Sequence, residues 1–212
     1  MNRFSQSTVN MSENTSAHHI LWRGILLPGH EACWLWWLGE NWQLEGTAVF
    51  AHKQKPCQLS YRIACDQSWQ TQSAEVQGWA GDERIDIHIR VNSEKRWWLN
   101  EKEVPGAAGS IDLDLNFSPC TNLLPIRRLG LEIGEAADIS PAWLRFPSFT
   151  LEPLAQRYQR TGKLSYRYES GVGRFMAELQ VDPQGFVVDY PGFGSRRPAF
   201  NRFDHDNYSP GQ

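Results

Sequence analysis

No apolar run in the sequence is long enough to cross a bilayer. The first apolar stretch, residues 20–27, is short and contains Arg23, whereas a spanning helix needs roughly 20 apolar residues. Residues 1–19 contain few large apolar side chains and lack the apolar centre of a secretory signal peptide. We therefore expect no transmembrane segment and a cytoplasmic protein.

The sequence also lacks an excess of positive charge. It has 21 basic and 24 acidic residues, a formal net charge of −3 and no basic run, so the charge pattern of a nucleic-acid-binding protein is missing. The four cysteines, Cys33, Cys57, Cys65 and Cys120, show no C-x-x-C spacing, which argues against a zinc ribbon or a redox pair. In a reducing compartment they are expected to be free, buried thiols. The sequence predicts neither a metal site nor a cofactor.

Familiar catalytic motifs are missing as well. There is no G-x-S-x-G nucleophile elbow, and the glycines of residues 171–173 are not followed by the helix that a phosphate-binding loop requires. His88 and Asp86 share the polar face of a predicted strand, where a solvated structural role is favoured over catalysis. Asp112 and Asp114 would point to one face about 7 Å apart, as in a metal site, an acid–base pair or an ordinary wet strand face. We expect no catalytic residue and no enzymatic activity.

Aromatic residues, in contrast, are abundant. Trp occurs 10 times, and aromatic residues make up 12% of the chain. Because Trp and Tyr join a large apolar body to a polar tip, they can pack in a core, stack on a sugar or line the pocket of an amphiphile. Core packing is the simplest interpretation of each one, since burying a large apolar side chain is worth about 1.5–3 kcal/mol.

Hydrophobicity alternates with a period of two residues through most of the chain. The clearest example is residues 85–91, where isoleucine and valine alternate with charged residues and histidine. Alternation of this kind is typical of antiparallel sheets with one wet face, and residues 182–185 suit a tight turn between two strands. A turn or two of helix is compatible with residues 124–131 or 154–161. The predicted fold class is mainly β: a large curved antiparallel sheet or incomplete β-barrel with one or two short helices.

One folded domain between two polar tails is the predicted organisation. The boundaries are a disordered N-terminal tail at residues 1–19, a single β domain at residues 20–194 and a flexible C-terminal tail at residues 195–212. Within the domain, Leu-Ser-Tyr-Arg occurs at residues 59–62 and again at residues 164–167. Each copy begins three predicted strands, so either two related meanders or a chance recurrence explains the match.

The alternation stops after residue 117. Residues 118–122 read Ser-Pro-Cys-Thr-Asn, where Pro119 stiffens the connection. Thr121 and Asn122 can hydrogen-bond their own backbone and fix a bend. The sequence therefore predicts an amphipathic strand over residues 111–117 and then a stiff polar bend.

Two adjacent arginines, Arg127 and Arg128, follow the bend. Neighbouring side chains diverge on a strand and on a helix alike, so one arginine is expected to face inward, where it needs an acidic or anionic partner. Asp112 or Asp114 would provide a structural ion pair. A bound phosphate, sulfate or sugar acid would serve equally well.

Residues 112–131, with the sequence DLDLNFSPCTNLLPIRRLGL, resemble the signature of the bacterial "putative glycolipid-binding" protein family. The family pattern is D-x-D-L-x-[FT]-[ST]-P-x-T-N-x-L-P-I-R-R-L, and Cys120 stands where a bulkier residue is expected. Shorter matches extend the resemblance over residues 20–193: LWRG at 21–24, EG at 45–46, YR at 61–62, CD at 65–66, QRY at 156–158, YRY at 166–168, VD at 181–182 and VDYPG at 188–192.

The resemblance implies a fold similar to that of the periplasmic lipoprotein carriers LolA and LolB, in which an incomplete antiparallel barrel holds acyl chains. It also implies non-catalytic binding of an amphiphilic ligand, a glycolipid or lipid-like molecule, in the concave face of the sheet. The candidate ligand-binding residues are Asp112, Asp114, Thr121, Asn122, Arg127, Arg128, Tyr61 and Tyr166. Two alternatives remain open: a regulatory or protein-interaction module without a small ligand, and a hydrolase acting on a glycolipid through Asp112, Asp114 or His88.

Overall fold

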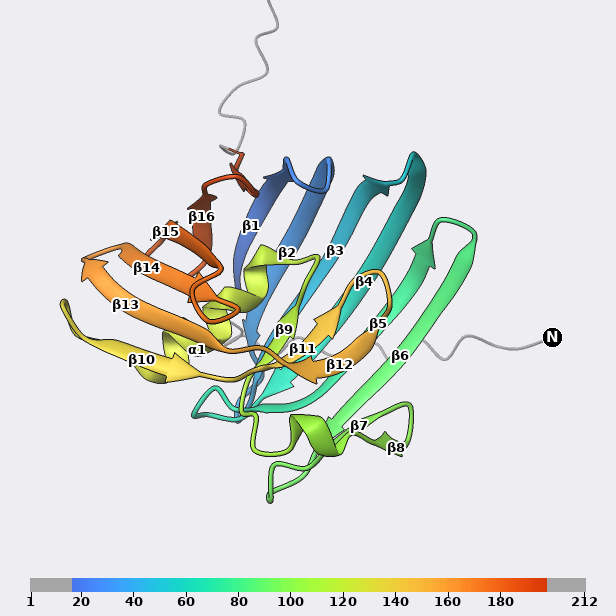
Figure 1. The fold of residues 1–212 in the computed structure, drawn as a ribbon, viewed down its shortest axis with the longest axis horizontal. Coiled ribbons are helices and arrows are strands. Elements are labelled where there is room, and N and C mark those ends of the chain that lie inside the picture. The colour runs from blue at the N-terminus through green and yellow to red at the C-terminus, as the bar shows by residue number, and fades with distance from the viewer. Residues whose placement is uncertain (1–16, 198–212) are drawn as a thin grey trace, which may run out of the picture.

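The computed structural model describes residues 17–197. Its main element is a 14-stranded antiparallel sheet that curves strongly without closing into a barrel (Figure 1). The fold-class prediction is therefore confirmed. In order across the sheet, the strands are β10 (Ala136–Ile139), β13 (Gln156–Gly162), β14 (Ser165–Ser170), β15 (Phe175–Val181), β16 (Val187–Tyr190), β17 (Gly194–Arg196), β1 (Ala17–Gly24), β2 (Gly29–Trp37), β3 (Trp42–His52), β4 (Lys55–Cys65), β5 (Thr71–Ala80), β6 (Glu83–Val91), β7 (Trp97–Leu99) and β8 (Lys102–Glu103).

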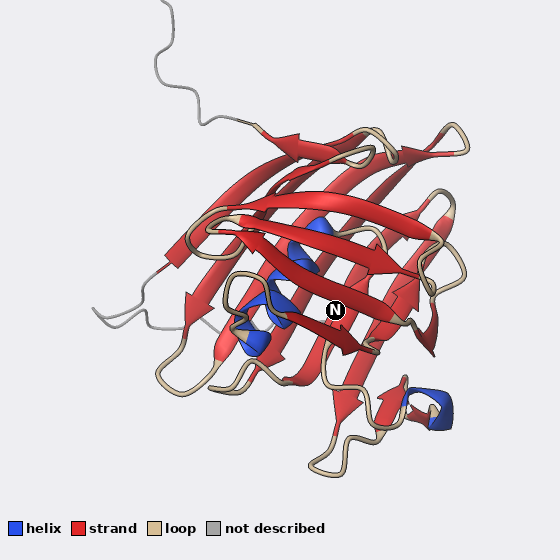
Figure 2. Ribbon diagram, turned by 60° about the vertical axis from the view of Figure 1, so that its left-hand side comes forward, coloured by secondary structure: helices blue, strands red, loops and turns tan. Residues whose placement is uncertain are grey.

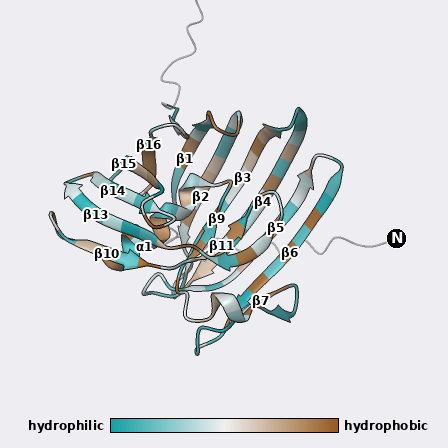
Figure 3. Ribbon diagram, in the orientation of Figure 1, coloured by the Kyte–Doolittle hydropathy of each residue, from teal (hydrophilic) through white to brown (hydrophobic). Residues whose placement is uncertain are grey.

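The period-two pattern of the sequence corresponds to the two faces of this sheet. On β6, Ile85, Ile87 and Ile89 are buried, whereas Asp86 and His88 are exposed, and the colours alternate along the long strands in Figure 3. The predicted turn at residues 182–185 connects β15 to β16. The two Leu-Ser-Tyr-Arg copies lie in β4 and across the start of β14, and each is followed by two strands that pair in succession, β5 and β6 or β15 and β16. β4 and β14 each pair with the strand before them as well, so both copies lie within longer meanders.

A smaller layer lies inside the curve of the large sheet (Figures 1 and 2). It consists of a three-stranded sheet in the order β12 (Thr150–Pro153), β11 (Ala142–Arg145) and β9 (Leu113–Leu115), the last two being parallel. The 3₁₀ helix η2 (Pro119–Asn122) follows β9 and leads directly into α1 (Leu123–Leu129), which confirms a short helix at this place, shifted by a residue or two from the predicted range 124–131. Gly130 ends α1 in the left-handed conformation, with φ of 55°. A further 3₁₀ helix, η1 (Pro105–Ala107), lies between β8 and β9.

Two predictions about secondary structure are wrong. The amphipathic strand expected over residues 111–117 is reduced to β9, an edge strand of the inner layer that contacts the large sheet at Thr71. Asp112, directly before β9, is only 1% exposed and does not face water. Residues 154–161 do not form a helix, because most of them belong to β13, which pairs with β10 and β14.

The predicted domain boundaries differ slightly from the strand ends. β1 already begins at Ala17 and β17 extends to Arg196, so the first and the last strand along the chain each include a few residues assigned to the tails. The rest of the two predicted tails, residues 1–16 and 198–212, lies outside the described residues. All four cysteines are buried and free. Between residues 17 and 197, no helix has both the length and the apolar character needed to cross a membrane.

Candidate functional site

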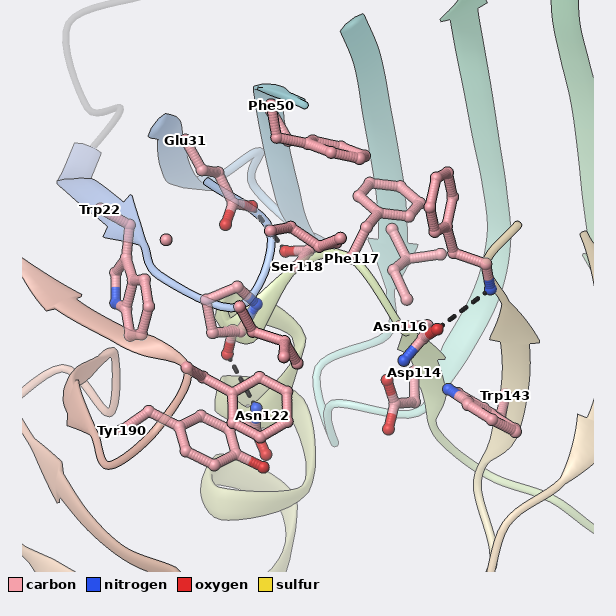
Figure 4. Close-up of a pocket in the computed structure, with 18 of the residues that line it drawn as sticks. Trp22, Glu31, Phe50, Asp114, Asn116, Phe117, Ser118, Asn122, Trp143 and Tyr190 are labelled. Atoms are coloured by element: carbon pink, nitrogen blue, oxygen red, sulfur yellow. Dashed lines mark hydrogen bonds between the residues drawn. The ribbon is translucent and has the colours of Figure 1, made fainter. Parts of the chain in front are cut away.

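A cavity of about 500 Å³ lies between the concave face of the large sheet and the smaller inner layer (Figure 4). Its volume is within the range of roughly 300–1,000 Å³ that is typical of small-molecule sites. One wall comes from β1, β2 and β3, a second from β14, β15 and β16, and the inner layer contributes β9, β11 and η2. The site is thus assembled from strands that are far apart in the sequence.

Two aromatic clusters line this cavity. Phe50, Phe117 and Phe146 form the first, with the rings of Phe50 and Phe146 in edge contact at a centroid distance of 5.3 Å. The second belongs to the other end of the sheet and to the loop before β17, and its members are Tyr168, Phe175, Tyr190 and Phe193.

Trp22 on β1 extends the apolar wall between these clusters. Its indole Nε1 donates a hydrogen bond of 2.7 Å to the carbonyl oxygen of Val187 on β16. The ring lies against Gly194, where an added Cβ would come within 2.3 Å of it. Glycine at this position therefore makes room for the indole.

Glu31 is an acid on the apolar face of β2. It is 4% exposed and shares that face with Cys33 and Leu35. Its Oε1 accepts hydrogen bonds of 2.5 Å from the hydroxyls of Tyr61 and Ser118, while Oε2 has no hydrogen-bond partner. Burial raises the pKa of Glu31 to about 7, although these hydrogen bonds favour the ionised form.

Gly46 allows Tyr61 to reach Glu31. Gly46 on β3 pairs with Cys33 on β2 and with Tyr61 on β4, and an added Cβ would lie 2.5 Å from the tyrosine hydroxyl oxygen. The tyrosine ring therefore lies flat over β3, and its hydroxyl spans from β4 to β2. No other residue type leaves room for this ring.

Asp114 and Asn122 are the two predicted site residues that line the cavity. Asp114 on β9 accepts a hydrogen bond of 2.5 Å from Nε2 of Gln156, and burial raises its pKa to about 6. Asn122 ends η2, where its Oδ1 accepts a hydrogen bond of 2.7 Å from the hydroxyl of Tyr158 and its Nδ2 donates to the carbonyl of Pro119. Both side chains come from the inner layer, across the cavity from Glu31 (Figure 4).

Asp112 and Arg128 form an ion pair outside the cavity. Nε and Nη2 of Arg128 donate to the two carboxylate oxygens of Asp112 at 2.8 and 2.6 Å. This is the structural alternative foreseen for an inward-facing arginine. Arg127 diverges from it, as expected for adjacent residues, and its guanidinium carbon lies over the Trp69 ring, 5.0 Å from the ring centroid.

The remaining candidates, Thr121, Tyr61 and Tyr166, also lie away from the cavity surface. The Thr121 hydroxyl donates to the carbonyl of Ser118 and accepts from the amide of Leu115, so it fixes the bend that the sequence predicted. Tyr61 acts on the cavity indirectly, by holding Glu31. Tyr166 lines a separate groove of about 190 Å³ together with Arg127.

Glu31, Trp22 and Ser118 are cavity residues that sequence reasoning missed. The signal for Glu31 was present, since the inward face of β2 runs from Leu35 through Cys33 to residue 31 with a period of two. The continuous apolar run of residues 32–38 begins one position after the acid, so Glu31 resembles a residue outside the strand. Within the part of the chain that the structure describes, no cluster of three or more His, Cys, Asp or Glu side chains could hold a metal ion.

A model of the family described as "Putative glycolipid-binding" matches residues 19–196. The crystal structure of a DUF1089 family protein from Pseudomonas aeruginosa is similar, with 28% sequence identity and a TM-score of 0.66 over 92% of this chain and 100% of that chain. A beta-barrel-like protein of domain of unknown function DUF1849 from Brucella abortus aligns with 9% identity and a TM-score of 0.46, over 86% of this chain and 93% of that one. No curated protein matches the sequence.

Proposed function

The chain belongs to the family described as "Putative glycolipid-binding", and from this we propose that it binds an amphiphilic ligand, a glycolipid or lipid-like molecule, without chemical turnover. The observation that carries the proposal is the aromatic-lined cavity of about 500 Å³ under the concave face of the sheet. Cavities with mostly apolar walls and a few placed polar groups are typical ligand sites.

The two kinds of lining suit the two parts of an amphiphile. The aromatic clusters offer apolar contact for an alkyl chain, and burying eight methylene groups there would contribute about 6 kcal/mol. Glu31, Asp114 and Asn122 offer hydrogen bonds to a polar head. In the proposal the concave face of the sheet is the surface that holds the apolar chain.

Occupancy of the cavity is the first test. Protein purified without detergent is extracted with organic solvent, and the extract is analysed by mass spectrometry. We expect an amphiphile in the extract in an amount comparable to that of the protein. A matched extract of protein with a blocked cavity serves as the control.

Ala48→Phe provides that blocked cavity, because Ala48 lies on the cavity wall and is 2% exposed. Val49→Phe is its matched control: the same substitution one residue along β3 points to the outer face, where Val49 is 52% exposed. The uncharged fluorescent probe N-phenyl-1-naphthylamine should bind to wild type and Val49→Phe, and at least about tenfold more weakly to Ala48→Phe.

Equal binding of the probe by both variants, together with an extract free of amphiphile, would contradict the proposal. A hydrolytic role is tested in parallel by incubating the protein with n-octyl β-D-glucoside and measuring free glucose. We expect no release above that of the Ala48→Phe variant.

A further inference from the structure

Two buried side-chain atoms among the described residues lack any hydrogen-bond partner: Oε2 of Glu31 and Nε2 of His52. Both residues line the same cavity. Buried polar atoms are almost always paired in folded proteins, because leaving one unpaired costs free energy. The coincidence of both atoms in one cavity wall indicates that something polar completes them.

We propose that Oε2 of Glu31 holds the head group of the ligand, and that this head group is uncharged and bears hydroxyls rather than phosphate, sulfate or carboxylate. The inference rests on the proposed function, since it names the class of ligand for the same cavity.

The geometry of Glu31 prepares one oxygen for a ligand. Oε1 is engaged by the hydroxyls of Tyr61 and Ser118, which come from β4 and from the segment before η2. These two bonds fix the orientation of the carboxyl group and leave Oε2 buried and without a partner, on a side chain that lines the cavity. A hydroxyl group suits this oxygen in either protonation state, because it can donate to a carboxylate or accept from a protonated carboxyl.

The charges around the cavity disfavour an anionic head. Glu31 on one wall and Asp114 on the other are its acidic residues (Figure 4). The one arginine in the lining, Arg174, is exposed, and no lysine lines the cavity. A phosphate placed at Glu31 would face carboxyl groups without a buried cation to compensate it.

The register of the strands places the second unpaired atom at a distance. Ala48 is the partner of Glu31 across β2 and β3, and His52 lies four residues further along the same face of β3, about 13 Å away by strand geometry. Phe50 lies between them on that face and lines the cavity. The wall is thus polar at Glu31, aromatic at Phe50 and polar again at His52, beside the hairpin that joins β3 to β4.

Isothermal titration calorimetry with two ligands of equal tail length tests the inference. The probes are n-octyl β-D-glucoside and n-octyl phosphate, each used below its micelle concentration. The proteins are wild type, Glu31→Leu, Glu31→Gln and, as a matched control, Glu83→Gln, since Glu83 is an exposed acid on β6. Circular dichroism and thermal unfolding of every variant confirm that it is folded.

Wild type and Glu83→Gln should bind the glucoside at least about tenfold more tightly than the phosphate. Glu31→Leu should weaken glucoside binding by roughly tenfold and leave phosphate binding unchanged or stronger, because it removes an acceptor and a like charge together. Glu31→Gln keeps an acceptor for Tyr61 and Ser118, so it should bind the glucoside within about threefold of wild type while its binding of the phosphate tightens.

Three results would refute the inference. Phosphate binding as tight as glucoside binding in wild type would overturn the head-group class and leave the proposed function intact. An equal loss of both ligands in Glu31→Leu and Glu31→Gln would show that Glu31 only supports the fold. Binding of neither ligand by wild type would overturn the proposed function and this inference with it.

Discussion

Replacing Arg128 by methionine separates an architectural role of the signature segment from a ligand-binding role. Arg128 is the partner of Asp112, whose side chain is 2% exposed, and the pair is bonded through two nitrogen–oxygen contacts. Arg128→Met leaves this carboxyl buried without its cation. Neither residue lines the large cavity, so the substitution should act on stability and leave the ligand site unchanged.

The magnitude follows from the burial of the two partners. Removing one member of a buried pair costs ~3–5 kcal/mol, and because the Arg128 side chain is 16% exposed we expect the lower end, about 3 kcal/mol. Arg127→Met is the natural comparison. It removes an exposed guanidinium stacked on Trp69, an interaction worth about 0.5–1 kcal/mol.

The double variant Asp112→Leu with Arg128→Met should be more stable than Arg128→Met alone, because no unpaired charge remains. Burial raises the pKa of Asp112 while Arg128 opposes the rise, so the defect of Arg128→Met should shrink as the pH falls and the carboxyl takes up a proton. Without Arg128, burial raises the pKa of Asp112 in the folded state further, so protonation of this carboxyl favours the folded variant over the unfolded one.

Urea unfolding followed by tryptophan fluorescence measures these free energies, and binding of N-phenyl-1-naphthylamine to the folded variants measures the cavity. An architectural role is refuted if the free energy of unfolding of Arg128→Met lies within about 1 kcal/mol of that of wild type, below the cost expected for a buried pair, while the variant no longer binds the probe. That outcome would make Arg128 a ligand contact.

Two further predictions concern the Glu31 site. Gly46→Ala places a Cβ 2.5 Å from the hydroxyl oxygen of Tyr61 and should destabilise the protein by about 1–3 kcal/mol through overpacking; urea unfolding measures the loss, and a further Tyr61→Leu substitution should recover part of it. The pKa of Glu31 rises from 4.5 to about 7 on folding, so its contribution is fully present below pH 4.5 and is lost as the pH rises to 7. The unfolding free energy of wild type minus that of Glu31→Gln should therefore fall by about 3 kcal/mol across that range. A difference that does not change with pH would contradict the raised pKa of Glu31.

The sequence was informative wherever one side of a strand meets water. Ile85, Ile87 and Ile89 alternate with charged residues because β6 has one wet face, so the strand and its orientation could be predicted. The same pattern misleads in the interior: Asp112 looks identical in sequence whether its carboxyl meets water or Arg128. Only the position of β9 in the inner layer, against the large sheet, distinguishes these cases, and that position depends on contacts with strands far along the chain.

The candidate site was harder to predict for a related reason. A single acid beside an apolar run, as at Glu31, resembles the end of a strand, and its partners Tyr61 and Ser118 are 30 and 87 residues away. Asn122 was predictable because Pro119 and its neighbours break the alternation locally. The sequence did not predict β13 because one of its buried positions, Gln156, is polar. Polar residues therefore occupy both faces of the strand, and hydrophobicity does not alternate with a period of two.

An open sheet has two edges, and here both are short. β8 at one edge consists of Lys102 and Glu103, which are exposed, and β10 at the other has four residues, of which Asp138 is paired with Arg157. The short strands β7 and β8 leave residues 83–87 of β6 without a strand partner at the first edge, and the exposed side chains there include those of Arg84 and Asp86. A second chain that added a strand at either edge would therefore have to desolvate charged side chains. The protein can keep a cavity that opens between its layers while these charges disfavour strand addition from another chain.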